Sequence, residues 1–223
     1  MLKKMLLEKG QKLLFIGDSV TDCERLKPDG EGLFRALGNG YVSFIDGWIR
    51  AVYPELAIRV VNKGISGNTV RDLKERWQKD VLDQNADWLS IMIGINDVWR
   101  QYDSPFIKET HVYIDEYEST LTQLVSITKS QVANIVLMTP FYIENNDNDQ
   151  MRRTMDQYGD VVKKIANENN CILVDTQAAF NKVLHHLYPA SLAWDRVHPD
   201  TAGHMILAKE FLNCIGFDWK KSL

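Results

Sequence analysis

Five short apolar runs are spaced along the chain, and each is followed by glycine or a polar residue. A strand buried on both faces, as in a parallel sheet, reads as a nearly continuous apolar run rather than an alternating one. The runs therefore predict buried parallel strands. We place these strands at Leu13–Ile16, Ile58–Val61, Trp88–Ile93, Ile135–Met138 and Ile172–Val174.

The segments between these runs carry apolar residues at the i, i+3, i+4 spacing of an amphipathic helix, as Val42, Ile45 and Ile49 do. We predict helices at Tyr41–Tyr53, Val70–Leu82, His111–Lys129, Met151–Asn169 and from about Ala202 to Cys214. Long irregular stretches in a compact domain commonly carry function. The longest ones are expected at Thr21–Asn39, Asn96–Lys108 and Phe141–Gln150.

Strands that alternate with helices predict an α/β fold, in which helices cover both faces of a parallel sheet through right-handed crossovers. The chain contains no internal repeat, low-complexity tract or linker. We therefore expect residues 1–223 to form a single domain, a three-layer α/β/α arrangement around a central five-stranded parallel sheet.

Composition narrows the possible partners. A chain of 223 residues, 45% of them apolar, can bury a core without disulfides or metals. The net charge is −4, and acidic and basic residues are mixed along the chain. Because no basic patch is visible, we expect no nucleic-acid partner.

The N-terminal stretch Met1–Leu7 superficially resembles the start of a signal peptide, but its apolar character ends at Glu8 and Lys9. No uninterrupted apolar segment is long enough to cross a bilayer. The sequence therefore predicts a cytoplasmic protein with no membrane association.

The three cysteines, Cys23, Cys171 and Cys214, are far apart and lack C-x-x-C spacing. Their odd number and spacing indicate neither a disulfide framework nor a zinc site. Cys23 lies close to Ser19 in the sequence, but no partner for a catalytic thiol follows from its spacing.

The first strand is followed by the most informative segment, Gly17-Asp18-Ser19. Glycine tolerates a sharp backbone turn that would strain other residues. The turn would place Ser19 at the carboxyl end of a strand, where open α/β sheets build their sites. A serine hydroxyl there is a candidate nucleophile, provided that a base and donors for an oxyanion are close.

Three further blocks stand out. Asn62-Lys63-Gly64-Ile65-Ser66-Gly67-Asn68 follows the second predicted strand, and Gly94-Ile95-Asn96-Asp97 follows the third. Asp195-Arg196-Val197-His198 precedes the last helix. Because parallel strands present their carboxyl ends at one edge, we expect the strand-end blocks to converge.

Each block also has a structural interpretation. Ser19 can cap a helix, and the glycines after the second strand can simply permit a turn. Asn96 and Asp97 can form Asx-turns, while Asp195 and His198 can be an exposed ion pair. The remaining histidines have no comparable context and are expected to be structural: His111, His185, His186 and His204.

Taken together and in this order, the blocks resemble the motifs of the SGNH hydrolases, also called the GDSL family. The resemblance extends from Gly17 to His198, with Val20 where the family name has leucine. Longer stretches around Gly64 and Asn96 are similar to bacterial acetylxylan esterases of this family. The resemblance implies an SGNH, flavodoxin-like fold and a serine esterase that removes acetyl groups from xylo-oligosaccharides.

The resemblance also implies roles. Ser19 would be the nucleophile, His198 the base and Asp195 the residue that orients the imidazole. The backbone N–H groups of Ser19 and Gly64 and the side-chain amide of Asn96 would hold the oxyanion. No metal or organic cofactor is required.

Trp99 and Trp194 flank two of the blocks and are expected to contact the substrate, although indole also fills cores. Two alternatives remain open. One is a lipase or lysophospholipase, which the lack of a visible apolar lid disfavours, and the other is a carbohydrate-binding module without turnover. Close relatives often assemble, so we also expect a homo-oligomer, with Tyr188 and Trp219 as candidate interface residues.

Overall fold

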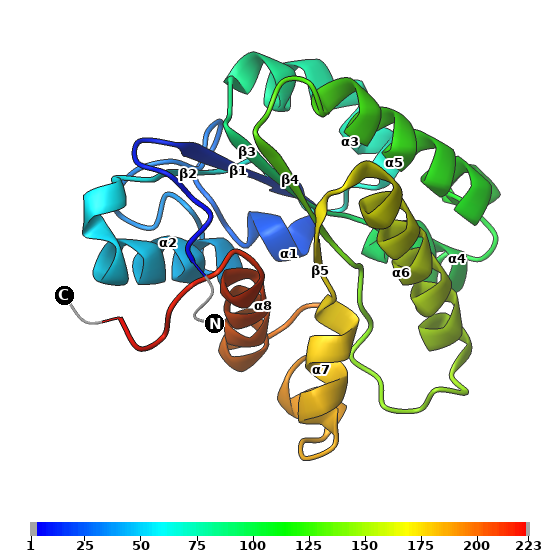
Figure 1. The fold of residues 1–223 in the computed structure, drawn as a ribbon. Coiled ribbons are helices and arrows are strands. Elements are labelled where there is room, and N and C mark those ends of the chain that lie inside the picture. The colour runs from blue at the N-terminus through cyan, green and yellow to red at the C-terminus, as the bar shows by residue number, and fades with distance from the viewer. Residues whose placement is uncertain (1–3, 222–223) are drawn as a thin grey trace.

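The computed structural model describes residues 4–221, and its centre is a parallel sheet of five strands in the order β2-β1-β3-β4-β5 (Figure 1). The predicted α/β fold with a five-stranded parallel sheet is therefore confirmed. Each observed strand overlaps the apolar run that predicted it. The strands are β1 (Lys12–Gly17), β2 (Arg59–Asn62), β3 (Trp88–Met92), β4 (Asn134–Met138) and β5 (Ile172–Val174).

Helices follow the strands along the chain. They are α1 (Ser19–Asp22), α2 (Tyr41–Val52), α3 (Val70–Asp80), α4 (Ile95–Asp103), α5 (Ile114–Thr128), α6 (Gln150–Asn169), α7 (Thr176–Leu184) and α8 (Thr201–Cys214). Short 3₁₀ turns lie at Pro54–Leu56, Leu82–Gln84, Lys108–Thr110 and Pro189–Ser191.

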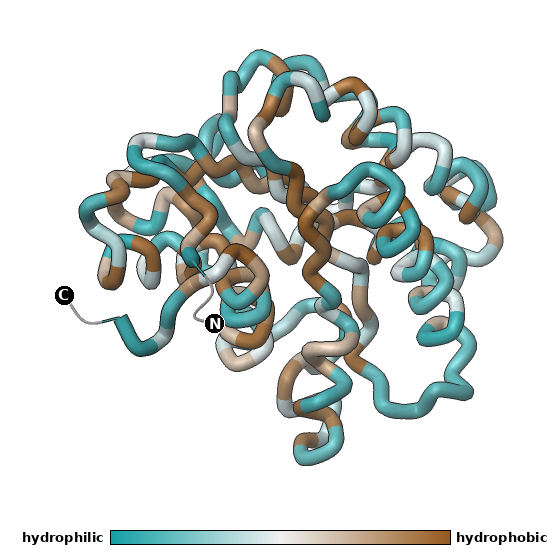
Figure 2. The backbone as a smooth tube through the Cα atoms, viewed as in Figure 1, coloured by the Kyte–Doolittle hydropathy of each residue, from teal (hydrophilic) through white to brown (hydrophobic). Residues whose placement is uncertain are grey.

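Two apolar cores lie on opposite faces of the sheet because successive strand residues point in opposite directions. In β1, Leu13 and Phe15 join the core formed with α2, α7 and α8, whereas Leu14 and Ile16 join the core formed with α3, α4, α5 and α6. The strands form the apolar centre and the outer helices carry the hydrophilic positions (Figure 2). This arrangement is the predicted three-layer architecture.

Strand order places a topological switch beside β1. The chain passes from β1 to β2 on one side and then to β3 on the other. In open α/β sheets such a reversal leaves a crevice at the carboxyl ends of the two strands that flank it. Ser19 follows β1 and Asn96 follows β3, so both residues lie at this edge.

The prediction of an irregular stretch at Asn96–Lys108 is wrong for the first half of that stretch, because those residues belong to α4. Ile95, Val98 and Trp99 have helical spacing, but the polar pair at 96–97 obscured the pattern. Helix α7 was also missed, although Asp175 caps its N-terminus through the Ala178 N–H. The helix expected from His111 begins only at Ile114.

Residues 1–3 of the stretch considered as a signal peptide lie outside the described residues. Between residues 4 and 221, no helix combines the length and the apolar character needed to span a bilayer.

Candidate active site

Ser19 is the first residue of α1, immediately after β1. The Asp18 carboxylate caps this short helix by accepting the Val20 N–H at 3.0 Å. Gly17 does not adopt a positive φ, so a left-handed backbone is not the reason that a Cβ would be strained here. A Cβ at Gly17 would instead lie 2.3 Å from the Met92 carbonyl oxygen, so glycine is required by the close approach of β3.

Three side chains form a hydrogen-bonded chain at this edge of the sheet. Ser19 Oγ lies 2.9 Å from His198 Nε2, and His198 Nδ1 lies 2.6 Å from Asp195 Oδ2. With Nδ1–H donating to the carboxylate, Nε2 keeps the lone pair that accepts the serine proton. Residues 179 positions apart in the sequence thus meet in the arrangement required for nucleophilic catalysis.

The loop that carries Asp195 and His198 is irregular and exposed, yet its geometry is fixed. Asp195 Oδ1 accepts the backbone N–H groups of Val197 at 2.9 Å and His198 at 2.8 Å. Partial burial raises the pKa of Asp195, but the hydrogen bonds from His198 and Val197 outweigh it and leave the pKa below its usual value. Arg196, which directly follows Asp195 in the same loop, has a left-handed φ of 65° and forms an ion pair with Glu144.

Asn96 lies in the first turn of α4 and is 2% exposed. Its Nδ2 donates one hydrogen bond, at 2.9 Å, to the Asn68 carbonyl oxygen. An amide nitrogen carries two protons, so one proton is held by the loop after β2 and the other stays available. This arrangement suits an oxyanion donor.

The geometry argues against Gly64 as an oxyanion donor, which corrects the sequence-based expectation. The Gly64 N–H already donates to Asn62 Oδ1 at 2.9 Å. A Cβ at Gly64 would lie 2.2 Å from the Asp22 nitrogen, so this glycine allows the loop to pack against the end of α1. Its role here is close packing.

Gly67, three residues later, was interpreted from the sequence only as a glycine that could permit a turn. It is exposed, has a φ of 83°, and lies in the turn closed by the Asn68 N–H and the Ile65 carbonyl. Among residues 4–221, no acceptor is recorded for its N–H. A sequence signal for a second candidate donor was present, because the block contains a second glycine, Gly67. Its neighbour Asn68 provides the carbonyl oxygen that accepts a hydrogen bond from Asn96.

The two tryptophans differ. The Trp99 ring packs edge-on against His198, with 5.7 Å between ring centroids and an interplanar angle of 64°. Trp194 is 90% exposed. The structure therefore brings Trp99 to the triad, while Trp194 extends into solvent beside it.

Two carboxyl groups are buried beneath the site. Burial raises the pKa of Asp18 to about 7 and that of Asp97 to about 8. Asp97 Oδ1 accepts the Val70 N–H at 2.9 Å, whereas its Oδ2 has no hydrogen-bond partner among the described residues. Burial therefore favours the neutral form of both carboxyl groups over the charged form, more strongly for Asp97 than for Asp18.

Cys23 follows α1 and lies 3.6 Å from His204, measured from Sγ to Nε2. His204 is buried, and burial lowers its pKa to about 4. Its Nδ1 accepts the Tyr41 N–H, so in the neutral ring the proton is on Nε2 and faces the sulfur. Burial raises the pKa of the Cys23 thiol. His204 therefore has no free lone pair with which to activate a thiol nucleophile.

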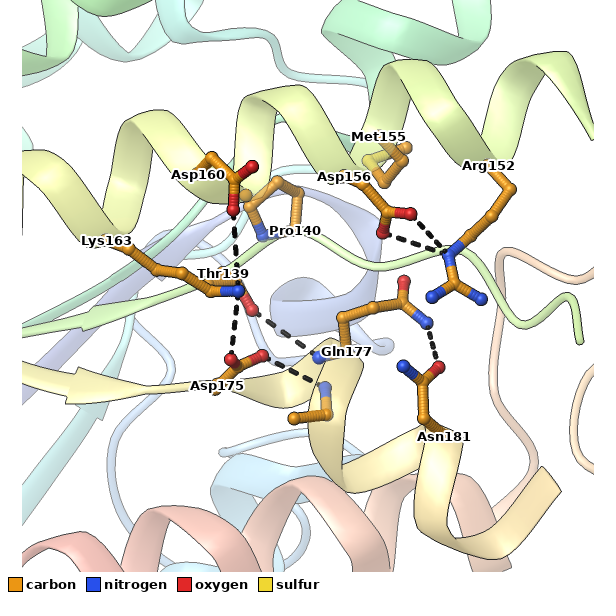
Figure 3. A pocket seen from close by; sticks show the side chains of 12 residues that line it. Thr139, Pro140, Arg152, Met155, Asp156, Asp160, Lys163, Asp175, Gln177 and Asn181 are labelled. Atoms are coloured by element: carbon orange, nitrogen blue, oxygen red, sulfur yellow. Dashed lines mark hydrogen bonds and ion pairs between the residues drawn. The ribbon is translucent and has the colours of Figure 1, made fainter. Parts of the chain in front are cut away.

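A separate cavity of about 190 Å³ lies beyond the carboxyl ends of β4 and β5 (Figure 3). Its charged side chains pair with one another: Lys163 with Asp175 at 3.1 Å, and Arg152 with Asp156 at 2.9 Å. None of the three triad residues lines this cavity.

Comparisons with known proteins agree with this geometry. The profile of the GDSL-like lipase/acylhydrolase family matches residues 15–206. The chain is 69% identical to an acetylxylan esterase of Geobacillus stearothermophilus over 218 residues, which cover 98% of this chain and 100% of the relative. The crystal structure of that esterase superposes with a TM-score of 0.97.

A second solved structure is an α/β hydrolase enzyme from the metagenome of Lake Arreo, Spain. It is 49% identical, with a TM-score of 0.94, and the match covers 96% of this chain and 99% of the other. Identity at this level over nearly full length, together with the family match, leads to one conclusion: the chain is a member of the GDSL-like lipase/acylhydrolase family.

Proposed function

We propose that the protein is a serine esterase that hydrolyses acetyl esters of xylo-oligosaccharides through an acyl-enzyme. The observation that carries the proposal is the continuous hydrogen-bonded chain Ser19–His198–Asp195, with distances of 2.9 and 2.6 Å. Solved structures of the Geobacillus stearothermophilus esterase include catalytic mutants in which a serine, an aspartate or a histidine is replaced by alanine. Serine, histidine and aspartate are also the residue types that form the hydrogen-bonded chain Ser19–His198–Asp195.

In the first half-reaction, Ser19 Oγ attacks the acetyl carbonyl carbon while His198 Nε2 removes the hydroxyl proton. The imidazolium that forms is stabilised by Asp195. The C–O bond to the sugar then breaks, and Nε2 returns the proton to the departing sugar oxygen. The products are a free sugar hydroxyl and an acetyl group esterified to Ser19.

In the second half-reaction, His198 Nε2 takes a proton from water, and the resulting hydroxide attacks the acetyl carbonyl. Collapse of this intermediate returns the proton to Ser19 Oγ and releases acetate. Three groups donate to the oxyanion in both steps: the N–H groups of Ser19 and Gly67 and the free proton of Asn96 Nδ2. Such donors act in the transition state, where negative charge develops on the carbonyl oxygen.

The accessibility of the triad supports a bulky polar alcohol as the leaving group. The side chains of His198 and Asp195 are 44% and 37% exposed. Trp99 borders the imidazole, and Trp194 stands exposed next to Asp195. Indole faces suit sugar rings, which present apolar C–H surfaces between polar hydroxyls. We assign substrate contact to both tryptophans on this ground.

Acetate release from acetylated xylo-oligosaccharides tests the proposal directly. We expect release by the protein and none above background by the Ser19→Ala variant. Equal release by both proteins would exclude this mechanism. Hydrolysis of p-nitrophenyl acetate compared with the octanoate ester tests the acyl specificity, and faster octanoate cleavage would favour the lipase alternative.

Assembly and location are further proposals. A homo-oligomer is supported by exposed aromatic side chains, since Tyr188 is 75% and Trp219 is 43% exposed. Light scattering of the purified protein tests this, and a monomeric mass would refute it. A cytoplasmic location is supported by Cys23 and Cys171, which are free thiols in the structure. Fractionation of the producing cells tests it.

A further inference from the structure

We infer that Arg76 is a positioning residue that sets the geometry of the oxyanion donors. Arg76 lies on α3, outside the four sequence blocks, and does not touch the triad. Its side chain is only 13% exposed. The inference rests on the proposed esterase function and adds to it a residue that acts through others.

The guanidinium of Arg76 joins the segments that follow β1 and β2. Nη2 donates to the Gly17 carbonyl oxygen at 3.1 Å, and Nη1 donates to the Lys63 carbonyl oxygen at 2.8 Å. Nε donates to Asn68 Oδ1 at 2.7 Å. Asp80, one turn further along α3, receives Nη1 at 3.0 Å and balances the buried charge.

Two of these acceptors, Gly17 and Asn68, lie close in sequence to groups proposed to act on the oxyanion. Gly17 lies two residues before Ser19, and Asn68 directly follows Gly67. The Asn68 carbonyl accepts one Nδ2 proton of Asn96 and so turns the other proton outward. One side chain thus restrains the backbone near Ser19 and Gly67 and, through Asn68, the Asn96 amide.

A flat guanidinium with fixed N–H directions can hold several carbonyl groups in one relative arrangement, which a lysine ammonium cannot do. Burial lowers the pKa of Arg76 from its usual high value, but arginine stays charged at any physiological pH. Charged hydrogen bonds of this kind are stronger than neutral ones. Their loss would free the loop after β2 to shift relative to β1.

Displacement of oxyanion donors affects the transition state more than the bound ester. We therefore expect Arg76→Gln to lower kcat by about 10- to 100-fold, because small misplacements near the reacting atoms cost up to about 100-fold. KM for p-nitrophenyl acetate should change by less than about threefold. Arg76→Lys should behave like Arg76→Gln, because charge alone does not restore the three carbonyl contacts.

Arg71 offers a matched control on the same helix. Its guanidinium also bridges three acceptors, namely Glu116 and the carbonyl oxygens of Glu109 and His111, none of which adjoins the site. Arg71→Gln should leave kcat within about twofold of the unsubstituted protein. Thermal unfolding of both variants separates lost stability from lost positioning.

A double-substitution cycle measures whether the effect of Arg76→Gln on kcat depends on Asn96. A purely structural role for Arg76 would not produce such a dependence. In the Asn96→Ala background, Arg76 no longer has an Asn96 amide to orient. Arg76→Gln should then cost clearly less in kcat than it does alone, since residues that act as a unit are non-additive. The same factor in both backgrounds, or an unchanged kcat in the single variant, would overturn the inference.

Phenylboronic acid binding, measured by calorimetry, separates this inference from the proposed function. The boronate adds to a serine hydroxyl and places an oxygen at the oxyanion position without any turnover. We expect Arg76→Gln to weaken its binding by about the factor lost in kcat. If the unsubstituted protein binds it but releases no acetate, the acetyl substrate is wrong and the Arg76 comparison still stands. Equal binding by both proteins refutes the role of Arg76 alone.

Discussion

The two halves of the active site are built in opposite ways. The proposed nucleophile Ser19 and the proposed donor Asn96 directly follow buried strands, where Asn96 is 2% exposed and Asp18, next to Ser19, is 1% exposed. The proposed base, His198, and its carboxylate partner, Asp195, lie on an irregular loop, where the His198 side chain is 44% exposed. Hydrogen-bond donors that must not reorganise during reaction gain from rigid, water-poor surroundings. A base that exchanges protons with water and with a leaving alcohol gains from access to solvent.

This contrast leads us to expect that substitutions on the loop lower activity without lowering stability, whereas substitutions at the strand ends lower both. On the exposed loop, side chains can be removed with little loss of packing. At the strand ends, the same groups that position the oxyanion also hold buried backbone together. The predictions below use this difference, beginning with the largest expected effect.

The largest effect should come from His198→Ala. Loss of the base should lower kcat by about 10,000-fold or more, as in other serine triads. Because the side chain is half-exposed, the midpoint of thermal unfolding should change by only a few degrees, about the range of a surface substitution. Steady-state kinetics and calorimetry measure the two quantities. Nearly full activity in this variant would show that His198 is not the base.

Asn96→Ala should lower kcat by about 100- to 1,000-fold, the usual cost of one oxyanion donor. In contrast to His198→Ala, it should also lower the free energy of unfolding, because it removes a buried side chain and leaves the partly buried Asn68 carbonyl without its donor. Urea unfolding provides this second measurement. A loss of activity without any loss of stability would contradict the proposed difference between the two halves.

Asp97→Asn should change how stability depends on pH. Burial raises the pKa of Asp97 from its ordinary value of 3.8 to about 8, so the folded protein keeps a proton that the unfolded chain releases. Stability from this group is therefore present below about pH 4 and is lost as pH rises toward about 8. Asparagine removes that loss, although Asp18 retains a smaller one of the same sign.

Urea unfolding of both proteins across this pH range gives the measurement. The free energy of unfolding of Asp97→Asn, relative to the unsubstituted protein, should rise between acid and mildly alkaline pH. A constant difference across the range would mean that Asp97 is not held neutral by burial.

The smallest effect should come from Glu144→Gln. Glu144 pairs with Arg196 in the loop that carries the triad acid and base, but Asp195 already fixes that loop through two backbone N–H groups. The Glu144 carboxylate is buried, but the Arg196 side chain is 43% exposed, so water screens the ion pair. We expect kcat to fall by less than about threefold. A loss as large as that of Asn96→Ala would mean that the loop depends on this ion pair.

Much of the molecule could be predicted from local pattern. Apolar runs located all five strands, since a strand buried on both faces leaves an unambiguous signal. Helix α4 was missed because Asn96 and Asp97 place two polar residues in its first turn. Both polar residues are buried in the structure, so they interrupt the apolar pattern on the buried face of the helix.

The glycines show a second limit. The sequence indicates that the loop after β2 needs glycine, but it does not say which N–H is free. Gly64 packs against Asp22 and donates to Asn62, whereas Gly67 is exposed in a turn. The hydrogen bond to Asn62 is local, but the packing of Gly64 against Asp22 joins segments that are distant in the chain.

The amino-acid order by itself determined the alternation of strands and helices, and with it the parallel sheet and the edge at which Ser19 and Asn96 lie. Burial and backbone sterics act over a few residues, so they can be read locally. Only the tertiary structure decided the meeting of Ser19 with His198, the choice between Gly64 and Gly67, and the contacts of Arg76 with three carbonyl-bearing residues. Those contacts join distant segments, and their geometry follows from packing that no short stretch of sequence encodes.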